Sequence, residues 1–230
     1  MGGCTLDLNL STLETPNRRS QITQTLRAAV LAGEMKVGEI YSAPMLATQF
    51  GVSATPVREA MIDLAKEGIV EVVRNKGFRV AQPSIQELQQ MMEVRLLLEV
   101  PTIRGIAARG LTADQRSAAQ HLAEASLESA QRNDLIAHVA ADIRFHLYLL
   151  SLSGNEELVD IIRVLRSRSR PYGLQSEKKR AFLLESAQEH LTLVRLIINK
   201  QPVQASELID SHIRRAGQEW SDPNSEIDLG

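Results

Sequence analysis

Apolar residues follow a helical period through the first part of the chain. Their spacing predicts one helix over residues 16–32, ended by Gly33, and a short second helix that starts after Ser42 and stops at Gly51. A third helix begins after Ser53, which is a suitable N-cap. Its apolar positions recur every three or four residues: Val57, Met61, Leu64 and Ala65. This third helix is therefore expected to bury its back and to expose its first turn.

After Gly68 the pattern changes to two short apolar runs, IVEVV and FRV, which predict a two-stranded hairpin. The connection Arg74-Asn75-Lys76-Gly77 suits a tight turn and places two cations at the tip. Two short helices followed by a basic hairpin are typical of a winged helix. In that fold the second helix enters the major groove with its first turn, which here carries Thr55 and Arg58, and the hairpin tip reaches phosphate or the minor groove. The pattern favours DNA binding over a small α/β core with merely solvated charges.

Beyond the linker Gln82-Pro83-Ser84 the pattern is helical almost to the end of the chain. Pro83 ends the last strand, Ser84 can cap a helix, and Pro101 is expected to bend that helix. Six helices are predicted over residues 84–109, 112–132, 134–152, 155–169, 176–199 and 203–219. Helices of this length form an antiparallel bundle. The expected fold is mainly α, with an N-terminal winged helix-turn-helix and a C-terminal all-α antiparallel helical bundle.

The distribution of charge supports this division. The net charge of the whole chain is −2, which does not indicate a nucleic-acid partner. Residues 16–82, however, contain nine Lys and Arg against six Asp and Glu, a net charge of +3, whereas residues 83–230 contain seventeen against twenty. The positive part is the predicted DNA reader, as the neutralisation of phosphates requires.

Cysteine usage and hydropathy bear on the compartment. The single cysteine, Cys4, excludes a disulfide within the chain and is typical of a reducing environment. The first ten residues lack the basic and apolar regions of a signal peptide, and no apolar run approaches the roughly 20 residues that span a bilayer. We therefore expect a cytoplasmic protein. Nucleotide-binding loops, hydrolase motifs and zinc-binding cysteine pairs are absent from the sequence.

The helical half contains a set of candidate metal ligands. Asp142 and His146 are four residues apart, so both side chains leave one face of a helix, while His190 and His212 belong to two other predicted helices. One carboxylate and three imidazoles can converge inside a bundle, and this set suits a divalent ion such as Zn, Ni or Mn. Taken singly, each histidine is more often a satisfied or solvated residue, and spacing alone leaves that alternative open.

The stretch VSATPVREAMIDLAKEGIVEVVRNKGFRV resembles the DNA-binding part of GntR-family bacterial transcription regulators, whose signature runs close to GVSRTPVREAL, EGLV and a glycine-tipped wing. The resemblance covers roughly residues 17–82. It implies DNA contacts from the recognition helix and the wing: Ser53, Thr55, Pro56, Arg58, Arg74, Lys76 and Gly77. Ala54 and Pro44 replace the charged residues common at these positions, so the family's usual operator sequence is not implied.

Residues 84–220 resemble the FCD effector domain of the FadR subfamily, in its six-helix, VanR-like version. The sequence DIRFH, followed by SGN and later by EH and H in the last two helices, carries this resemblance. It implies one metal site with four ligands: Asp142, His146, His190 and His212. It also implies that Arg95 and Glu99, in an RxxLE pattern, lie near an effector carboxylate, although a salt bridge between the two inside the bundle is an equal alternative.

Three further charged features remain. His121 is expected on the surface, and His138 has no counterpart among the ligands that the resemblance implies. The run RSRSR at 166–170 is expected to end a helix, where cations favour the dipole, with one arginine able to reach the ligand pocket.

Together these features predict a homodimeric DNA-binding repressor that responds to a small organic acid bound at a divalent metal. A dimer is expected because one recognition helix reads few base pairs and a two-fold axis matches a palindromic operator. One alternative is a regulator that senses the metal itself or uses it only structurally, and another is a metalloenzyme, which would lack a convincing general base. The predicted division is a flexible tail over 1–15, a winged-helix DNA-binding domain over 16–82, a helical effector, metal-binding and dimerisation domain over 83–222, and a flexible tail over 223–230.

Overall fold

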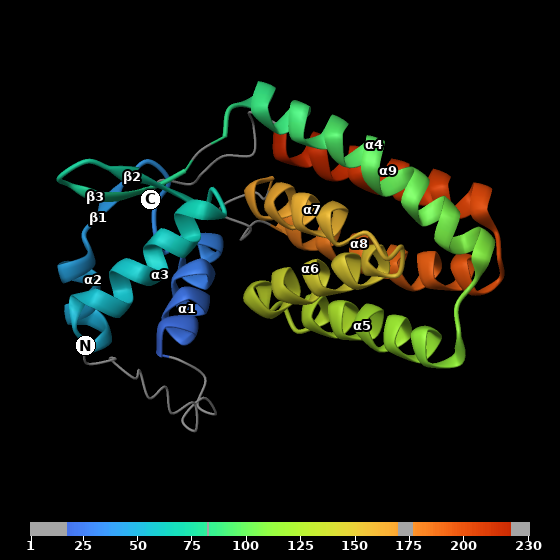
Figure 1. The fold of residues 1–230 in the computed structure, drawn as a ribbon, viewed down its shortest axis with the longest axis horizontal. Helices are drawn as coiled ribbons and strands as arrows, with labels where there is room; N and C mark the ends of the chain where they lie inside the picture. Colours follow the sequence, from blue (N-terminus) through green and yellow to red (C-terminus); the bar gives the residue numbers. More distant parts are fainter. Residues whose placement is uncertain (1–17, 82, 170–176, 222–230) are drawn as a thin grey trace, which may run out of the picture.

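The computed structural model describes residues 18–81, 83–169 and 177–221, whose elements form two parts (Figure 1). The first part contains helices and a small sheet: α1 Arg18–Ala32, β1 Ile40–Tyr41, α2 Ala43–Phe50, α3 Ala54–Lys66, β2 Val70–Val73 and β3 Gly77–Val80. The second part is helical: α4 Ile85–Arg109, α5 Ala113–Gln131, α6 Leu135–Ser151, α7 Glu156–Arg168, α8 Glu177–Ile198 and α9 Pro202–Ser221. The predicted mainly α fold is confirmed, and each of the six helices of the second part ends within two residues of its predicted bounds.

Local caps explain where the helix-turn-helix elements α2 and α3 begin and end. Ser42 accepts a hydrogen bond from the backbone N–H of Met45 at the start of α2, and Gly51 ends that helix with a φ of 62°. Ser53 occupies the N-cap position of α3, but its side chain makes no capping bond. The rear of α3 is buried through Val57, Ala60, Met61 and Leu64. The predicted Ala65 is only half-buried, and Ala60 takes its place in the core.

Helix α1 packs against α3, and two arginines of α1 form ion pairs with acidic residues of the α3 segment, including one of 3.8 Å between Arg19 and Glu59. The Arg19 guanidinium donates to Asp63 from Nε at 2.6 Å and from Nη2 at 2.5 Å. About two turns further along α1, Nη2 of Arg27 donates to both carboxylate oxygens of Glu67, at 2.6 and 2.7 Å. These contacts hold the C-terminal end of α3 against α1, while the first turn of α3 stays exposed.

The hairpin belongs to a three-stranded antiparallel sheet in the order β1-β3-β2. Strand β1 was not predicted, so the expectation of a two-stranded wing was incomplete; two residues are too few to show an alternating pattern. The hairpin turn uses Asn75 and Gly77, which both have positive φ, at 61° and 134°. A Cβ at Gly77 would collide with the carbonyl oxygen of Tyr41. Glycine is therefore needed at this position for β1 to approach β3.

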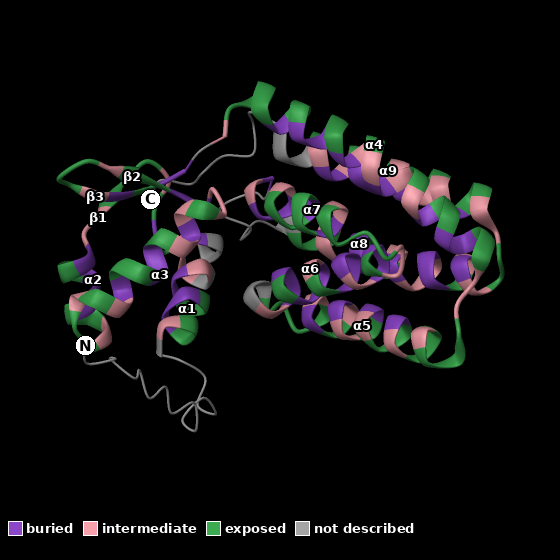
Figure 2. Cartoon of the chain, in the orientation of Figure 1, coloured by how far each residue is buried: buried purple, intermediate pink, exposed green. Residues whose placement is uncertain are grey.

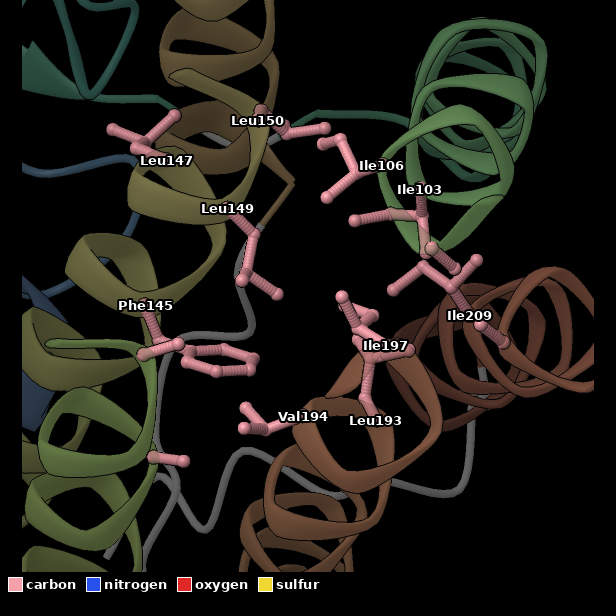
Figure 3. Packing of buried hydrophobic residues seen from close by; sticks show 14 of the residues in the cluster. Ile103, Ile106, Phe145, Leu147, Leu149, Leu150, Leu193, Val194, Ile197 and Ile209 are labelled. Carbon is pink, nitrogen blue, oxygen red and sulfur yellow. The ribbon is translucent and has the colours of Figure 1, made fainter. Parts of the chain in front are cut away.

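A mainly aliphatic core, which also contains Phe145, joins the helices of the second part (Figure 3). Helix α4 lies along α9, while α5 packs against both α6 and α8 (Figure 1). The faces turned toward one another are buried and the outer faces are exposed (Figure 2). Helix α4 continues through Pro101, which is exposed; the predicted bend at this residue stays a prediction. None of the described helices is long and apolar enough to cross a membrane.

One contact between the two parts of the described chain lies at the end of α7, and α1 also contacts α6. The side chain of Arg168, in the last turn of α7, lies over Gly68 in the turn between α3 and β2. A Cβ at Gly68 would be 2.6 Å from Cδ of Arg168, and Gly68 has a φ of 71°. Val70 of the sheet and Val164 of α7 line a hollow beside this contact. The winged helix therefore contacts the helix end that carries Arg166 and Arg168 of the RSRSR run, whose last residue, Arg170, lies outside the described residues.

Candidate metal centre and DNA-binding surface

The four candidate metal ligands come from three helices of the bundle. Helix α6 supplies Asp142 and His146 one turn apart, α8 supplies His190 and α9 supplies His212. All four side chains are buried, and one potential ligand atom from each lies within 4.8 Å of the others. The structure therefore brings together residues that are up to 70 positions apart in the sequence, as the predicted convergence requires.

The distances between these groups describe a compact cluster of nitrogen and oxygen atoms. Oδ1 of Asp142 lies 3.7 Å from Nε2 of His146 and 3.5 Å from Nε2 of His190. The two Nε2 atoms of His146 and His190 face each other at 3.1 Å. The ring of Phe145 stacks on His190 with a centroid separation of 4.4 Å, so an apolar wall holds this imidazole in place.

Neighbouring groups orient two of the imidazoles. Glu189 Oε2 lies 2.9 Å from Nδ1 of His212, and because a carboxylate only accepts, Nδ1 is the donor and Nε2 is the ring nitrogen left to bind a metal. Arg215 in turn pairs with Glu189. The Ser126 hydroxyl lies 3.2 Å from Nδ1 of His190, where it can accept in the same way. Such outer partners are a common feature of histidine metal ligands.

Burial also sets the protonation of the cluster. Burial, followed by the nearby Arg166 guanidinium, holds the pKa of His146 well below its ordinary value. Burial is likewise the main cause of the strongly lowered pKa of His190. Both rings are therefore neutral at neutral pH, which is the form that binds metals. Two neutral rings whose Nε2 atoms face each other at 3.1 Å, beside a carboxylate, fit a divalent cation between them.

A chain of buried charges lies beside the cluster. Glu99 accepts from Nε of Arg95 at 2.8 Å and from Nη2 of Arg166 at 2.6 Å. Nη1 of Arg166 lies 3.6 Å from Oδ2 of Asp142, so this arginine connects Glu99 to the candidate ligand. Burial lowers the pKa of Arg95 to about 10, which leaves it charged at neutral pH. The predicted salt bridge between Arg95 and Glu99 is present, and it lies next to the four candidate metal ligands.

Arg166 is the main residue of this region that sequence reasoning did not place. The charged run predicted a helix end with one arginine reaching the pocket, and the structure shows Arg166 buried while its neighbour Arg168 turns to the winged helix. His138, one turn before Asp142, is buried with Nδ1 at 3.1 Å from the Ser126 carbonyl oxygen. His121 is exposed, as expected.

The residues predicted to contact DNA lie on one helix turn and on the hairpin tip. Ser53, Thr55 and Arg58 are exposed at the start of α3, where Pro56 is half-buried. Arg74 and Lys76 are exposed between β2 and β3. Gly77 has a backbone role, described above, in the close approach of β1. The recognition helix thus presents its first turn outward while its rear side chains fill the core, which is the geometry that groove reading needs.

Comparisons with known proteins agree with this arrangement. The family model described as "Bacterial regulatory proteins, gntR family" matches residues 18–80, and the model described as "FCD domain" matches residues 90–215. The Nta operon transcriptional regulator of Aminobacter aminovorans is 30% identical over 180 residues, which cover 77% of this chain and 82% of that protein. The HTH-type transcriptional repressor GlaR of Escherichia coli K12 is 26% identical over 195 residues, covering 82% of this chain and 89% of that protein.

Solved structures show the same fold. E. coli McbR/YncC superposes with a TM-score of 0.72 at 22% sequence identity, over 88% of this chain and 98% of that chain. The family and its relatives are transcriptional regulators rather than enzymes, which removes the metalloenzyme alternative. The chain belongs to the GntR family of bacterial transcription regulators and joins the family's N-terminal DNA-binding domain to a C-terminal FCD domain.

Proposed function

We propose that this protein is a homodimeric repressor whose affinity for a palindromic operator changes when a small organic acid binds at a divalent metal in the helical part. The observation that carries the proposal is the convergence of Asp142, His146, His190 and His212 beside two buried arginines. A metal held by these four residues would supply a Lewis acid for a carboxylate oxygen of the effector. The guanidinium groups of Arg95 and Arg166 supply the charge that holds the acid in a buried site.

The DNA-reading role assigned to the first part follows from exposure and charge. Arg58 and Thr55 stand exposed on the first turn of α3, where major-groove contacts are made, and Arg74 and Lys76 stand at the hairpin tip. An effector can alter operator affinity only through its differential affinity for two arrangements of the dimer. The contact between α7 and the winged helix supports such a dependence, because it links the effector-binding part to the DNA-binding part.

The dimer is supported by apolar side chains that remain exposed on two neighbouring helices of the bundle. Leu97 on α4 is 73% exposed and Val94 is 40% exposed, while Ile161 and Val164 on α7 are 48% and 38% exposed. A second copy of the chain would cover such a surface, and a two-fold pair of recognition helices would match a palindrome.

Metal content and acid binding test the core of the proposal. Purified protein reconstituted with Zn, Ni or Mn should hold about one equivalent per subunit, and the Asp142→Ala/His212→Ala double variant should hold little. His121→Ala, which changes an exposed histidine, is the matched control and should bind metal normally. Equal metal content in the wild type and the double variant would reject the site.

A thermal-shift screen of organic acids separates an acid sensor from a metal sensor. If an acid is the effector, it should raise the melting temperature of the metal-loaded protein and leave the metal-free protein unchanged. If no acid does so while metal alone alters operator affinity, the protein senses the metal itself. If neither affects operator binding, the ion is structural.

Operator binding tests the DNA-reading residues. Arg58→Ala should weaken binding to the specific operator, whereas Lys76→Ala should weaken specific and non-specific binding alike and lower the salt slope by about one unit for each bound subunit. Glu128→Ala, an exposed change on α5, is the control. An Arg58→Ala variant that binds the operator like the wild type would refute the proposed role of α3.

A further inference from the structure

Two buried hydrogen-bond donors at the end of α7 have no partner among the described residues. They are Nε of Arg166, whose side chain is 3% exposed, and the hydroxyl of Ser169, which is fully buried. The two residues are three positions apart at the end of one helix, so their side chains lie on the same face. Buried donors without acceptors are rare in proteins and costly, so each one needs an explanation.

The other nitrogens of Arg166 show where this face points. Nη2 donates to Glu99 at 2.6 Å and Nη1 lies 3.6 Å from Asp142, so the guanidinium lies beside one of the candidate metal ligands. Nε is the nitrogen of this guanidinium that has no hydrogen-bond partner among the described residues. A molecule bound beside the candidate metal ligands could therefore supply one group that accepts hydrogen bonds from both Nε and the Ser169 hydroxyl.

The charges of the region give the sign of that group. The buried arginines Arg95 and Arg166 are balanced by the carboxylates Glu99 and Asp142, so the protein side chains alone are neutral. A divalent ion held by the neutral imidazoles raises the total to two positive charges in a buried place. Uncompensated buried charge is costly, and a ligand with two negative charges restores neutrality whereas a monocarboxylate leaves one positive charge.

We propose that the effector is a dicarboxylate, with one carboxylate on the metal and the second accepting hydrogen bonds from Nε of Arg166 and the hydroxyl of Ser169. A carboxylate offers two oxygens, which match the two unmet donors. Because the carbonyl end of α7 lies at this point, the helix dipole does not attract an anion, and the Arg166 guanidinium must supply the positive charge. The inference rests on the proposed acid-sensing function and specifies the class of acid.

A matched set of ligands tests the second carboxylate. Unbranched dicarboxylates from succinate to adipate are titrated by calorimetry into the metal-loaded, full-length protein, each beside its own monoamide, which keeps the shape but removes one charge. At least one dicarboxylate should bind about ten-fold tighter or more than its monoamide, as expected for a hydrogen bond to a charged group. Equal binding of every pair overturns the dicarboxylate inference and leaves the acid-sensing function intact. Failure of all the acids to bind the loaded protein overturns both.

The Ser169→Ala variant tests the location. Since the hydroxyl has no partner among the residues that the structure describes, its removal should leave metal content and melting temperature unchanged. It should weaken the dicarboxylate several-fold and leave the affinity of the monoamide, bound through its single carboxylate at the metal, as in the wild type. Ser151→Ala, at the exposed end of α6, is the control and should bind both ligands normally. An equal loss of affinity for both ligands, or no loss for either, would place the second carboxylate elsewhere and overturn the assignment.

Discussion

Substitution of Glu99 by glutamine directly probes the buried charges beside the candidate metal ligands. Glu99 is 1% exposed and accepts from Arg95 at 2.8 Å and from Arg166 at 2.6 Å. Burial raises the pKa of Glu99, but the Arg166 and Arg95 guanidinium groups outweigh it, so the pKa lies below the ordinary value and the side chain is ionised at neutral pH. Glutamine has almost the same shape, but it has only one acceptor oxygen, and its NH₂ group would face an arginine donor.

The magnitude follows from these contacts. A lost hydrogen bond to a charged group costs about 1.5–3 kcal/mol, and a broken buried ion pair costs about 3–5 kcal/mol in total because a charge is left without compensation. In a chain of 230 residues, 1 kcal/mol corresponds to about 2–4 °C in melting temperature. We therefore expect Glu99→Gln to lower the melting temperature of the metal-free protein by roughly 6–20 °C.

Thermal unfolding of metal-free protein at pH 7, followed by circular dichroism, measures this effect. The same substitution at Glu128 is the control, because Glu128 pairs with Arg132 at 3.9 Å and the two side chains are 66% and 65% exposed. Such exposed pairs contribute about 0–1 kcal/mol. If Glu99→Gln lowers the melting temperature no more than Glu128→Gln does, the buried charges do not stabilise the bundle and the reasoning is wrong.

Three other perturbations have defined outcomes. Burial lowers the pKa values of His146 and His190 in the folded state, so the unfolded chain binds more protons below a pH of about 6.5. The stability of the metal-free protein should therefore fall by up to roughly 3 kcal/mol per pH unit as the pH drops below that value. Urea titrations at pH 7.5, 6 and 5 that show no such trend would contradict this. Glu189→Gln should weaken metal binding about 10–100-fold because it removes the carboxylate that orients His212, which a chelator competition assay measures and an unchanged affinity would disprove. Gly77→Ala should destabilise the winged helix by more than about 1 kcal/mol because its Cβ would strike the backbone of β1, and unaltered hydrogen exchange in β1 and β3 would show that the strand tolerates it.

Local signals explain how much of the fold could be predicted. At the start of α4, Ser84 and Glu87 form a capping box, and Thr112 and Gln115 do the same for α5, so these helix starts are encoded within four residues. Strand β1 has no comparable signal. Its two residues are a strand because they pair with β3, and that pairing depends on a glycine 37 positions away from Ile40 in the chain.

The candidate site divides in the same way. The spacing of Asp142 and His146 on one helix could be read from the sequence, whereas the approach of α8 and α9 depends on packing. Arg166 is an arginine in a basic run at a helix end, a context in which exposure is the usual outcome. It is buried because Glu99 and Asp142, from two other helices, lie within reach, and only the tertiary structure places them there.

The last turn of α7 carries two arginines whose side chains contact different parts of the protein. Arg166 reaches inward to Glu99 and Asp142, and Arg168, two positions later, rests on Gly68 at the base of the winged helix. Residues two apart on a helix point to nearly opposite sides, so this single turn places one side chain among the buried charges of the bundle and the other against the winged helix. The buried ion pairs of the helical part and a contact with the winged helix are therefore carried by one and the same turn of helix.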